Sequence, residues 1–268
     1  MTSQPPPLKE QPPVKNPNPV PVLFKISKEK PWVVYTILVV TALMYGLQML
    51  SGYFSAGNYD WPKLLGAKIN DLILAGQLWR LITPVLLHAS LIHIAFNMYA
   101  LLVLGPEMER FYGHKRFLLL YLVGAYTGNV LSFLLSSSAS IGASTAIFGL
   151  VAAQVVFIYR NKLLFGKRTG PMLMNMGMVV AFNLVLGMRP GIDNWGHLGG
   201  LIGGLLFAWF GGPRFKIQPG ESGLELKDIH SKHDVLWGFL WSAGLFTAIV
   251  IGRSEERRVG KECRYRWS

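Results

Sequence analysis

The sequence WRLITPVLLHASLIHIAFNM, residues 79–98, combines a long apolar run with ionisable side chains inside it. A helix needs about 20 mostly apolar residues to cross the roughly 30 Å hydrocarbon core of a membrane. An ionisable side chain within such a span costs about 2.5 kcal/mol or more near its centre. We therefore expect a membrane helix here, and a functional reason for its polar residues.

The whole chain has the composition of a membrane protein. Hydrophobic residues make up 51% of the 268 residues, charged residues only 15%, and the mean hydropathy is +0.35. Soluble domains usually carry about 25% charged residues. The sequence therefore predicts an all-α, polytopic transmembrane helix bundle. Its seven predicted spans are approximately residues 32–50, 84–104, 117–135, 144–159, 172–188, 195–210 and 235–252.

The net charge of +12 reports orientation rather than a nucleic-acid partner. With the N-terminus inside, the inner segments hold sixteen Lys and Arg residues, whereas the outer segments before residue 253 hold four. Cytoplasmic loops of membrane proteins are enriched in basic residues. We therefore expect a cytoplasmic N-terminus.

The two ends of the chain differ from the spans in composition. Residues 1–31 hold nine of the sixteen prolines and are predicted to be a disordered cytoplasmic tail. The run RSEERRVGKEC, residues 253–263, looks like a codon-for-codon translation of a common sequencing-adapter string. We expect residues 253–268 to be an assembly artefact without function. The single cysteine, Cys263, lies in this segment and excludes an internal disulfide.

Five polar side chains fall in the outer half of the membrane if the spans alternate in direction: His88, His93, Asn97, Ser144 and His197. A serine hydroxyl is a weak nucleophile until a base takes its proton, and His197 is a suitable base. His93 and Asn97 are spaced i, i+4 and so share a helix face. With the backbone N–H of Ser144 at a helix N-terminus, they are candidate donors to an oxyanion. The set indicates a Ser–His dyad.

Small residues explain how two spans could bring this dyad together. The stretch GHLGGLIGG, residues 196–204, places Gly200 and Gly204 on a ridge beside His197. Such ridges let helix backbones approach closely. Phe148 lies one turn below the serine and is expected to pack on the His197 ring.

Each feature also has a plainer explanation. A serine at a helix start is usually an N-cap, and a glycine ridge alone is helix packing. The histidines suggest a metal site, but no carboxylate or thiol accompanies them, and His88 and His93 diverge by roughly 140° on a helix. We therefore predict no metal and no cofactor. Asp193, in a loop before His197, is not assigned as a third catalytic member.

The combined motifs resemble those of the rhomboid intramembrane serine proteases over about residues 32–252. The matching elements are a Trp-Arg pair (Trp79, Arg80), HxxxxHxxxN (His88, His93, Asn97), GxxxExxxG (Gly105, Glu109, Gly113), GASTAIFGL at the GxSG nucleophile motif (Ser144), and HxxGxxxG (His197, Gly200, Gly204).

This resemblance assigns roles to the polar set. It implies that Ser144 is the nucleophile and His197 the base. His93, Asn97 and the Ser144 amide look like the oxyanion hole, with His88 as a supporting residue.

Three further positions take their interpretation from the same resemblance. Glu109 looks like a structural anchor on the cytoplasmic side. Thr145 follows the nucleophile where the family most often has Gly, and its β-branch adds bulk at a close helix contact. Phe148 stands where Tyr is common, which keeps the ring and loses the hydroxyl.

The implied activity is cleavage of membrane-anchored proteins near the outer face of a bacterial plasma membrane. Residues 51–83 resemble a loop that lies half in the membrane. The expected partners are transmembrane substrates and the lipid bilayer, with no nucleic acid. A non-catalytic rhomboid-like protein that binds transmembrane helices remains the alternative. A transporter would show internal repeats or charges in mid-span, and the sequence has neither.

Overall fold

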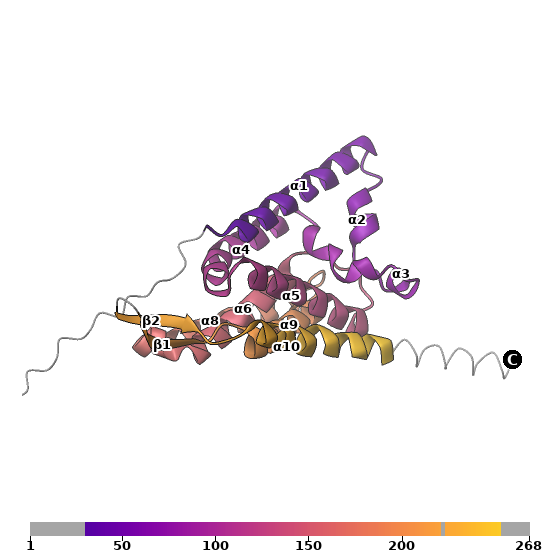
Figure 1. The fold of residues 1–268 in the computed structure, drawn as a ribbon. Helices are drawn as coiled ribbons and strands as arrows, with labels where there is room; N and C mark the ends of the chain where they lie inside the picture. Colours follow the sequence, from indigo (N-terminus) through magenta and orange to yellow (C-terminus); the bar gives the residue numbers. More distant parts are fainter. Residues whose placement is uncertain (1–29, 221–222, 253–268) are drawn as a thin grey trace, which may run out of the picture.

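The computed structural model describes residues 30–220 and 223–252. Nearly all of the predicted Pro-rich tail and the whole adapter-like segment lie outside these residues. Each of the seven predicted spans contains helix (Figure 1). The long helices are α1 (Trp32–Phe54), α4 (Leu91–Tyr112), α5 (His114–Leu135), α6 (Ser144–Arg160), α8 (Thr169–Leu186), α9 (Asn194–Gly211) and α10 (Lys232–Phe239), which continues through a π-helical turn, η4 (Leu240–Gly244), to Gly252.

Short helices fill two of the connections. The segment between α1 and α4 contains α2 (Trp61–Gly66), α3 (Asn70–Leu74), η1 (Leu78–Leu81) and η2 (Thr83–Leu86). The connection from α6 to α8 contains α7 (Lys162–Phe165) and η3 (Gly166–Arg168).

Five helices of the described chain are long and apolar enough to cross a membrane: Trp32–Phe54, Leu91–Tyr112, His114–Leu135, Lys162–Leu186 and Lys232–Gly252. The α6 helix is a shorter apolar helix of 17 residues, and α9 has 18 residues, many of them glycines. The chain is therefore an integral membrane protein built as a helical bundle, and the count of seven spans stays a prediction.

The second span begins later than predicted, and the placement of His88 inside it was wrong. Its helix starts at Leu91 rather than near residue 84, because Ser90 acts as the N-cap and accepts a hydrogen bond from His93 N at 3.2 Å. Pro84 belongs instead to the short η2 turn. His88 therefore lies in the connection between η2 and α4, where its backbone is free to bond elsewhere.

The centre of the bundle consists of α5, α6 and α9, which lie together below α1 and α4 in Figure 1. Glycines set their spacing. A Cβ added at Gly200 would lie within 3.0 Å of the Thr145 backbone, and one at Gly204 within 3.0 Å of the Gly149 backbone. On the other side of α9, a Cβ at Gly199 would meet the backbone oxygen of Thr127 on α5 at 2.5 Å. The α9 backbone is thus packed closely against α6 and α5. This packing fixes the position of the α9 side chains, including His197, relative to both helices.

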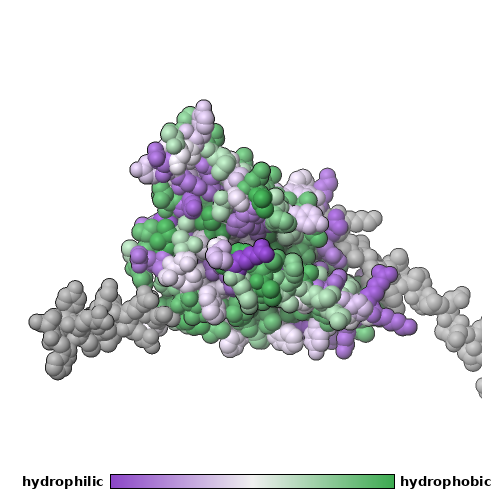
Figure 2. Space-filling model, turned by 180° about the vertical axis from the view of Figure 1, so that it is seen from behind, coloured by the Kyte–Doolittle hydropathy of each residue, from purple (hydrophilic) through white to green (hydrophobic). Residues whose placement is uncertain are grey.

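The outside of the bundle is apolar, as a lipid-facing surface must be. Figure 2 shows hydrophobic residues over much of one face, with hydrophilic residues in separate patches. The α8 helix buries none of its residues. Large exposed side chains of α1, such as Leu43 at 65%, and of α4, such as Phe96 at 72%, point outward. This surface is consistent with lipid rather than water as the surrounding solvent.

A β-hairpin between α9 and α10 was not predicted. Strands β1 (Phe215–Gly220) and β2 (Gly223–Asp228) pair antiparallel, with Phe215 opposite Asp228. The segment is short and mixes polar with apolar residues, so its pattern does not stand out from an ordinary loop. It is a small addition to the helical fold.

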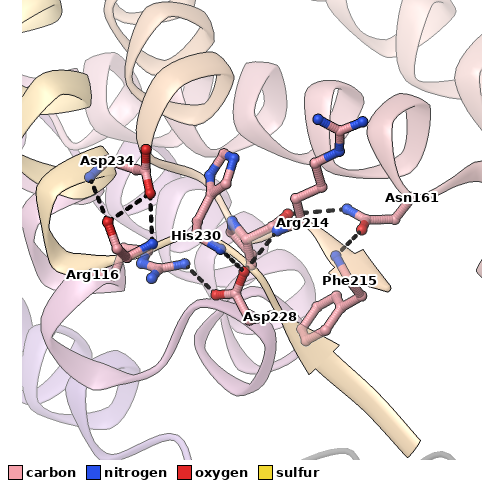
Figure 3. A network of polar contacts seen from close by, with 9 residues as sticks. Arg116, Asn161, Arg214, Phe215, Asp228, His230 and Asp234 are labelled. Carbon is pink, nitrogen blue, oxygen red and sulfur yellow. Dashed lines mark hydrogen bonds and ion pairs between the residues drawn. The ribbon is translucent and has the colours of Figure 1, made fainter. Parts of the chain in front are cut away.

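A polar network attaches the hairpin to the bundle (Figure 3). Asp228 accepts hydrogen bonds from the Arg116 side chain on α5 at 2.8 Å and from Arg214 N at 2.9 Å. Asn161, after α6, accepts a hydrogen bond from Phe215 N at 2.8 Å. The hairpin is therefore bonded to the start of α5 and to the end of α6.

Glu109 ties α1 to α4. Its carboxylate, 1% exposed, accepts from Val33 N at 2.9 Å and Val34 N at 2.8 Å, and it contacts the His114 ring. The first N–H groups of a helix have no partner within the helix, and a negative charge there is favoured by the helix dipole. Glu109 thus supplies the missing acceptors at the start of α1.

Removing this carboxylate is expected to loosen α1. A Glu109→Ala variant should lose about 3 kcal/mol of stability, because two buried N–H groups lose charged acceptors. Thermal unfolding in detergent measures the effect, with Glu107→Ala, an exposed position two residues away, as the matched control. Equal melting temperatures of the two variants would contradict the anchoring role.

Candidate active site

Ser144 is the first residue of α6, and the segment before it is held by backbone contacts. Gly142 N donates to the carbonyl of Pro84 at 2.9 Å, and Ala143 N donates to His88 Nε2 at 3.4 Å. Gly142 has φ +133°, a conformation that favours glycine. These contacts place Ser144 at the positive end of a helix.

The structure brings Ser144 and His197 together. His197 Nε2 lies 2.9 Å from Ser144 Oγ, a hydrogen-bond distance. His197 is the fourth residue of α9 and is 8% exposed. Phe148, one turn along α6, stacks on its ring with centroids 4.3 Å apart and planes 14° from parallel. The stacking restricts the imidazole to an orientation that faces the serine.

The arrangement is a dyad in the described part of the chain. If Nε2 accepts the serine proton, the imidazole proton sits on Nδ1, which is buried and has no hydrogen-bond partner there. Asp193 is engaged elsewhere: its carboxylate accepts from Gly196 N at 2.9 Å and from the Ser132 hydroxyl. Asp193 therefore caps α9 and ties it to α5.

His93 faces Ser144, whereas Asn97 bonds within its own helix. A Cβ built on Gly142 would lie 2.8 Å from His93 Nε2 and 3.7 Å from Ser144 Oγ, so ring and hydroxyl border the same small space. Ala89 N donates to His93 Nδ1 at 3.5 Å, which leaves the ring proton on Nε2. Asn97 Nδ2 donates to the His93 carbonyl at 2.9 Å. Of the two expected side-chain donors, His93 is thus the one beside Ser144 in this conformation.

The His88 ring packs against the His93 ring, and the Gln48 side chain bonds the His88 backbone. The His88 ring is 1% exposed and meets the His93 ring edge-on, with centroids 5.0 Å apart. Gln48 on α1 accepts from His88 N at 3.0 Å and donates to His88 O at 3.1 Å and to Asp60 Oδ2 at 2.8 Å. Gln48 was not predicted as part of the site, although a glutamine within an apolar span is a usable signal.

Trp79 and Arg80 hold part of the segment between α1 and α4. Arg80, 2% exposed, donates to the carbonyls of Ala67 and Leu64, each at 2.7 Å. Trp79 is 52% exposed and donates from Nε1 to Leu65 O at 3.0 Å. The pair therefore binds carbonyls at the C-terminal end of α2.

Thr145 fits into a space that a glycine leaves on α5. A Cβ at Gly128 would lie 2.6 Å from the Thr145 Cβ, and one at Gly196 would lie 3.0 Å from its Cγ2. The threonine side chain thus packs where α5, α6 and α9 meet. The volume of the threonine side chain is accommodated because Gly128 and Gly196, which face it, have no side chains.

Metal ligands do not gather in this region. Across residues 30–220 and 223–252, no group of three or more His, Cys, Asp or Glu side chains could hold a metal ion.

Comparison with known proteins places this geometry in a family. The family model for the Rhomboid domain matches residues 75–214, slightly more than half of the chain. Rhomboid protease GluP of Bacillus subtilis (strain 168) is 40% identical over 180 residues, 67% of this chain and 34% of that protein. RHOMBOID-like protein 9, chloroplastic, of Arabidopsis thaliana is 38% identical over 167 residues, 62% of this chain and 38% of that protein.

The match thus spans about a third of the length of these two relatives. It covers the nucleophile position, both histidines of α4 and its preceding connection, and His197. The helical membrane bundle and the sequence motifs agree with it. The chain belongs to the rhomboid family.

Proposed function

We propose that this chain is an intramembrane serine endopeptidase that cleaves membrane-anchored proteins with a Ser144–His197 dyad. The observation that carries the proposal is the 2.9 Å hydrogen bond between His197 Nε2 and Ser144 Oγ inside a helical membrane protein. A relative named as a protease, GluP, supports it further.

In the acylation step, His197 Nε2 takes the hydroxyl proton as Ser144 Oγ attacks the carbonyl carbon of the scissile amide. The carbonyl π electrons move to oxygen, and the resulting oxyanion accepts from His93 Nε2–H and the Ser144 N–H. Asn97 keeps His93 in place through its carbonyl. The tetrahedral carbon then expels the amine, which takes the proton from His197, and an acyl-enzyme remains.

Deacylation needs water at the same carbon. His197 takes a proton from water, hydroxide attacks the ester, and Ser144 leaves with the proton that His197 returns. The site is therefore expected to open to the aqueous side, and the distribution of basic residues supports placing that side at the outer face. The proposed location is a bacterial plasma membrane. The N-terminus is then cytoplasmic and the chain spans the membrane seven times.

The substrate is a membrane-anchored protein whose helix unwinds near its outer end. An intact transmembrane helix satisfies its own carbonyls and hides them from attack. Unwinding beside the site exposes one scissile carbonyl to Ser144.

A fluorophosphonate probe tests this proposal. Attack of Ser144 Oγ on phosphorus expels fluoride and leaves a stable phosphonyl ester, so the purified chain should become labelled. Ser144→Ala should abolish labelling. Ser137→Ala, at an exposed serine in the connection between α5 and α6, should retain it. Folded but unlabelled protein would overturn the protease proposal in favour of a rhomboid-like protein that binds helices without cutting them.

A further inference from the structure

Lys68 is a buried lysine outside the dyad, and its contacts converge on the segment before Ser144. It lies between α2 and α3 and is 0% exposed. Its ammonium donates to Ser136 O at 3.1 Å and Ser138 O at 2.8 Å. Its backbone forms an antiparallel bridge with Ser140, through Lys68 N to Ser140 O at 3.0 Å and Ser140 N to Lys68 O at 3.1 Å.

The segment that Lys68 contacts has little packing of its own. Residues 136–140 read SSSAS, and Ser137, Ser138 and Ala139 are exposed. Small polar side chains bury almost no apolar area, so hydrophobic packing contributes little to the position of this segment. Hydrogen bonds from neighbouring elements must hold it instead. Asn70 supplies one more, from Nδ2 to Ser136 O at 2.9 Å.

An ammonium suits this position for two reasons. It carries three donors, enough to reach two carbonyls at once. It also lies at the C-terminal end of α5, whose C-cap is Ser136, where the helix dipole favours a positive charge. One side chain therefore caps α5 and holds the chain that follows it.

We propose that Lys68 is a positioning residue for the nucleophile: its ammonium holds residues 136–143 so that Ser144 starts α6 within reach of His197. The effect on cleavage rests on the proposed function. The effect on residues 136–143 does not, and it is measurable without any substrate.

Burial also affects the charge of Lys68. Burial lowers the pKa of Lys68 from its usual 10.5 to about 8, and the Asp193 carboxylate opposes this shift. The other groups that bond the ammonium are the two serine carbonyls, while Arg80 bonds the adjoining Ala67 carbonyl. Between pH 8 and 10.5 the unfolded chain binds more protons, so this group's contribution to stability rises with pH. Release of the side chain into water would return its pKa toward 10.5, so by the same linkage its hold on residues 136–143 does not weaken as pH rises over this range.

The first experiment is hydrogen–deuterium exchange of Lys68→Met at pH 7, compared with Lys63→Met. Methionine keeps the length of the side chain and removes its donors, and Lys63 is an exposed lysine of the same outer segment. Exchange in peptides covering residues 136–143 should accelerate in Lys68→Met only. Unchanged exchange there would overturn the proposal even if the protein proves inactive.

The second experiment measures cleavage of a single-span substrate at pH 7. Lys68→Met should lower kcat about 10- to 100-fold with little change in KM, as small displacements of a reacting group do. Lys63→Met should cleave like the unmodified chain, and a Lys68→Met kcat equal to that of Lys63→Met would overturn the role. If Lys68→Met fails to fold, Lys68→Gln takes its place, and a kcat equal to that of Lys63→Gln is the contrary result.

Discussion

Replacing either Ser144 or His197 by alanine is expected to reduce substrate cleavage to one common floor, about 10⁴- to 10⁶-fold below the unmodified chain. In the proposed mechanism the two side chains act as a single functional unit, joined by their 2.9 Å hydrogen bond. Without the imidazole, the serine keeps its proton, and without the hydroxyl there is no nucleophile to activate. The double variant should therefore be no slower than either single variant.

Initial rates on a single-span substrate in liposomes measure this effect. His233→Ala, at an exposed histidine of α10, and Ser137→Ala are the matched controls and should cleave normally. A His197→Ala variant within tenfold of the unmodified rate would show that another group serves as the base. Unchanged cleavage by Ser144→Ala would eliminate the dyad altogether.

Substituting Gly204 should separate α9 from α6. A Cβ at this position would lie within 3.0 Å of three Gly149 backbone atoms. Backbone atoms cannot move aside as a flexible side chain can, so the two helices must part. Overpacking of this kind costs about 3 kcal/mol. Because His197 lies two turns away on the same helix, the separation should also lengthen its bond to Ser144.

Thermal unfolding and fluorophosphonate labelling of Gly204→Ala test both consequences. We expect a lower melting temperature and slower labelling per folded molecule. Gly177→Ala on α8 is the control, because nothing lies within 4 Å of its added Cβ and alanine favours helix by about 1 kcal/mol. Equal stability of the two variants would show that α6 and α9 tolerate more distance than their packing indicates.

The fold class and the family could be predicted from the sequence, and both predictions are confirmed by the helical bundle and the Rhomboid match. A long apolar run indicates a membrane span directly, because the hydropathy of each residue adds to the total independently of its neighbours in the fold. The boundary at Leu91 was missed because Pro84 and Ser90 compete locally to end and begin helical turns. The hairpin was missed because its strands are too short for a clear pattern.

The candidate site also contains residues that could be predicted from the sequence and residues that could not. Ser144, His197 and His93 stand out in the sequence as polar groups that a membrane disfavours without a reason, and their motifs identify them singly. Gln48 stands out as a polar residue in an apolar span, but its partners and those of Lys68 could not be predicted, because most of them are backbone carbonyls and amides. Backbone groups are the same in every residue, so a sequence carries no sign of which ones a buried side chain will meet.

The sequence by itself determined that this chain enters a membrane as helices and which residue types could act on an amide there. Only the tertiary structure decided that α9 lies close enough to α6 for His197 to meet Ser144. It also decided that Lys68 reaches the connection before Ser144 and that Gln48 reaches the connection that carries His88. The physical reason is the sequence separation over which each effect acts. Hydropathy and motif spacing act along the chain, whereas a hydrogen bond between residues 53 positions apart exists only after glycine-lined helices have packed together.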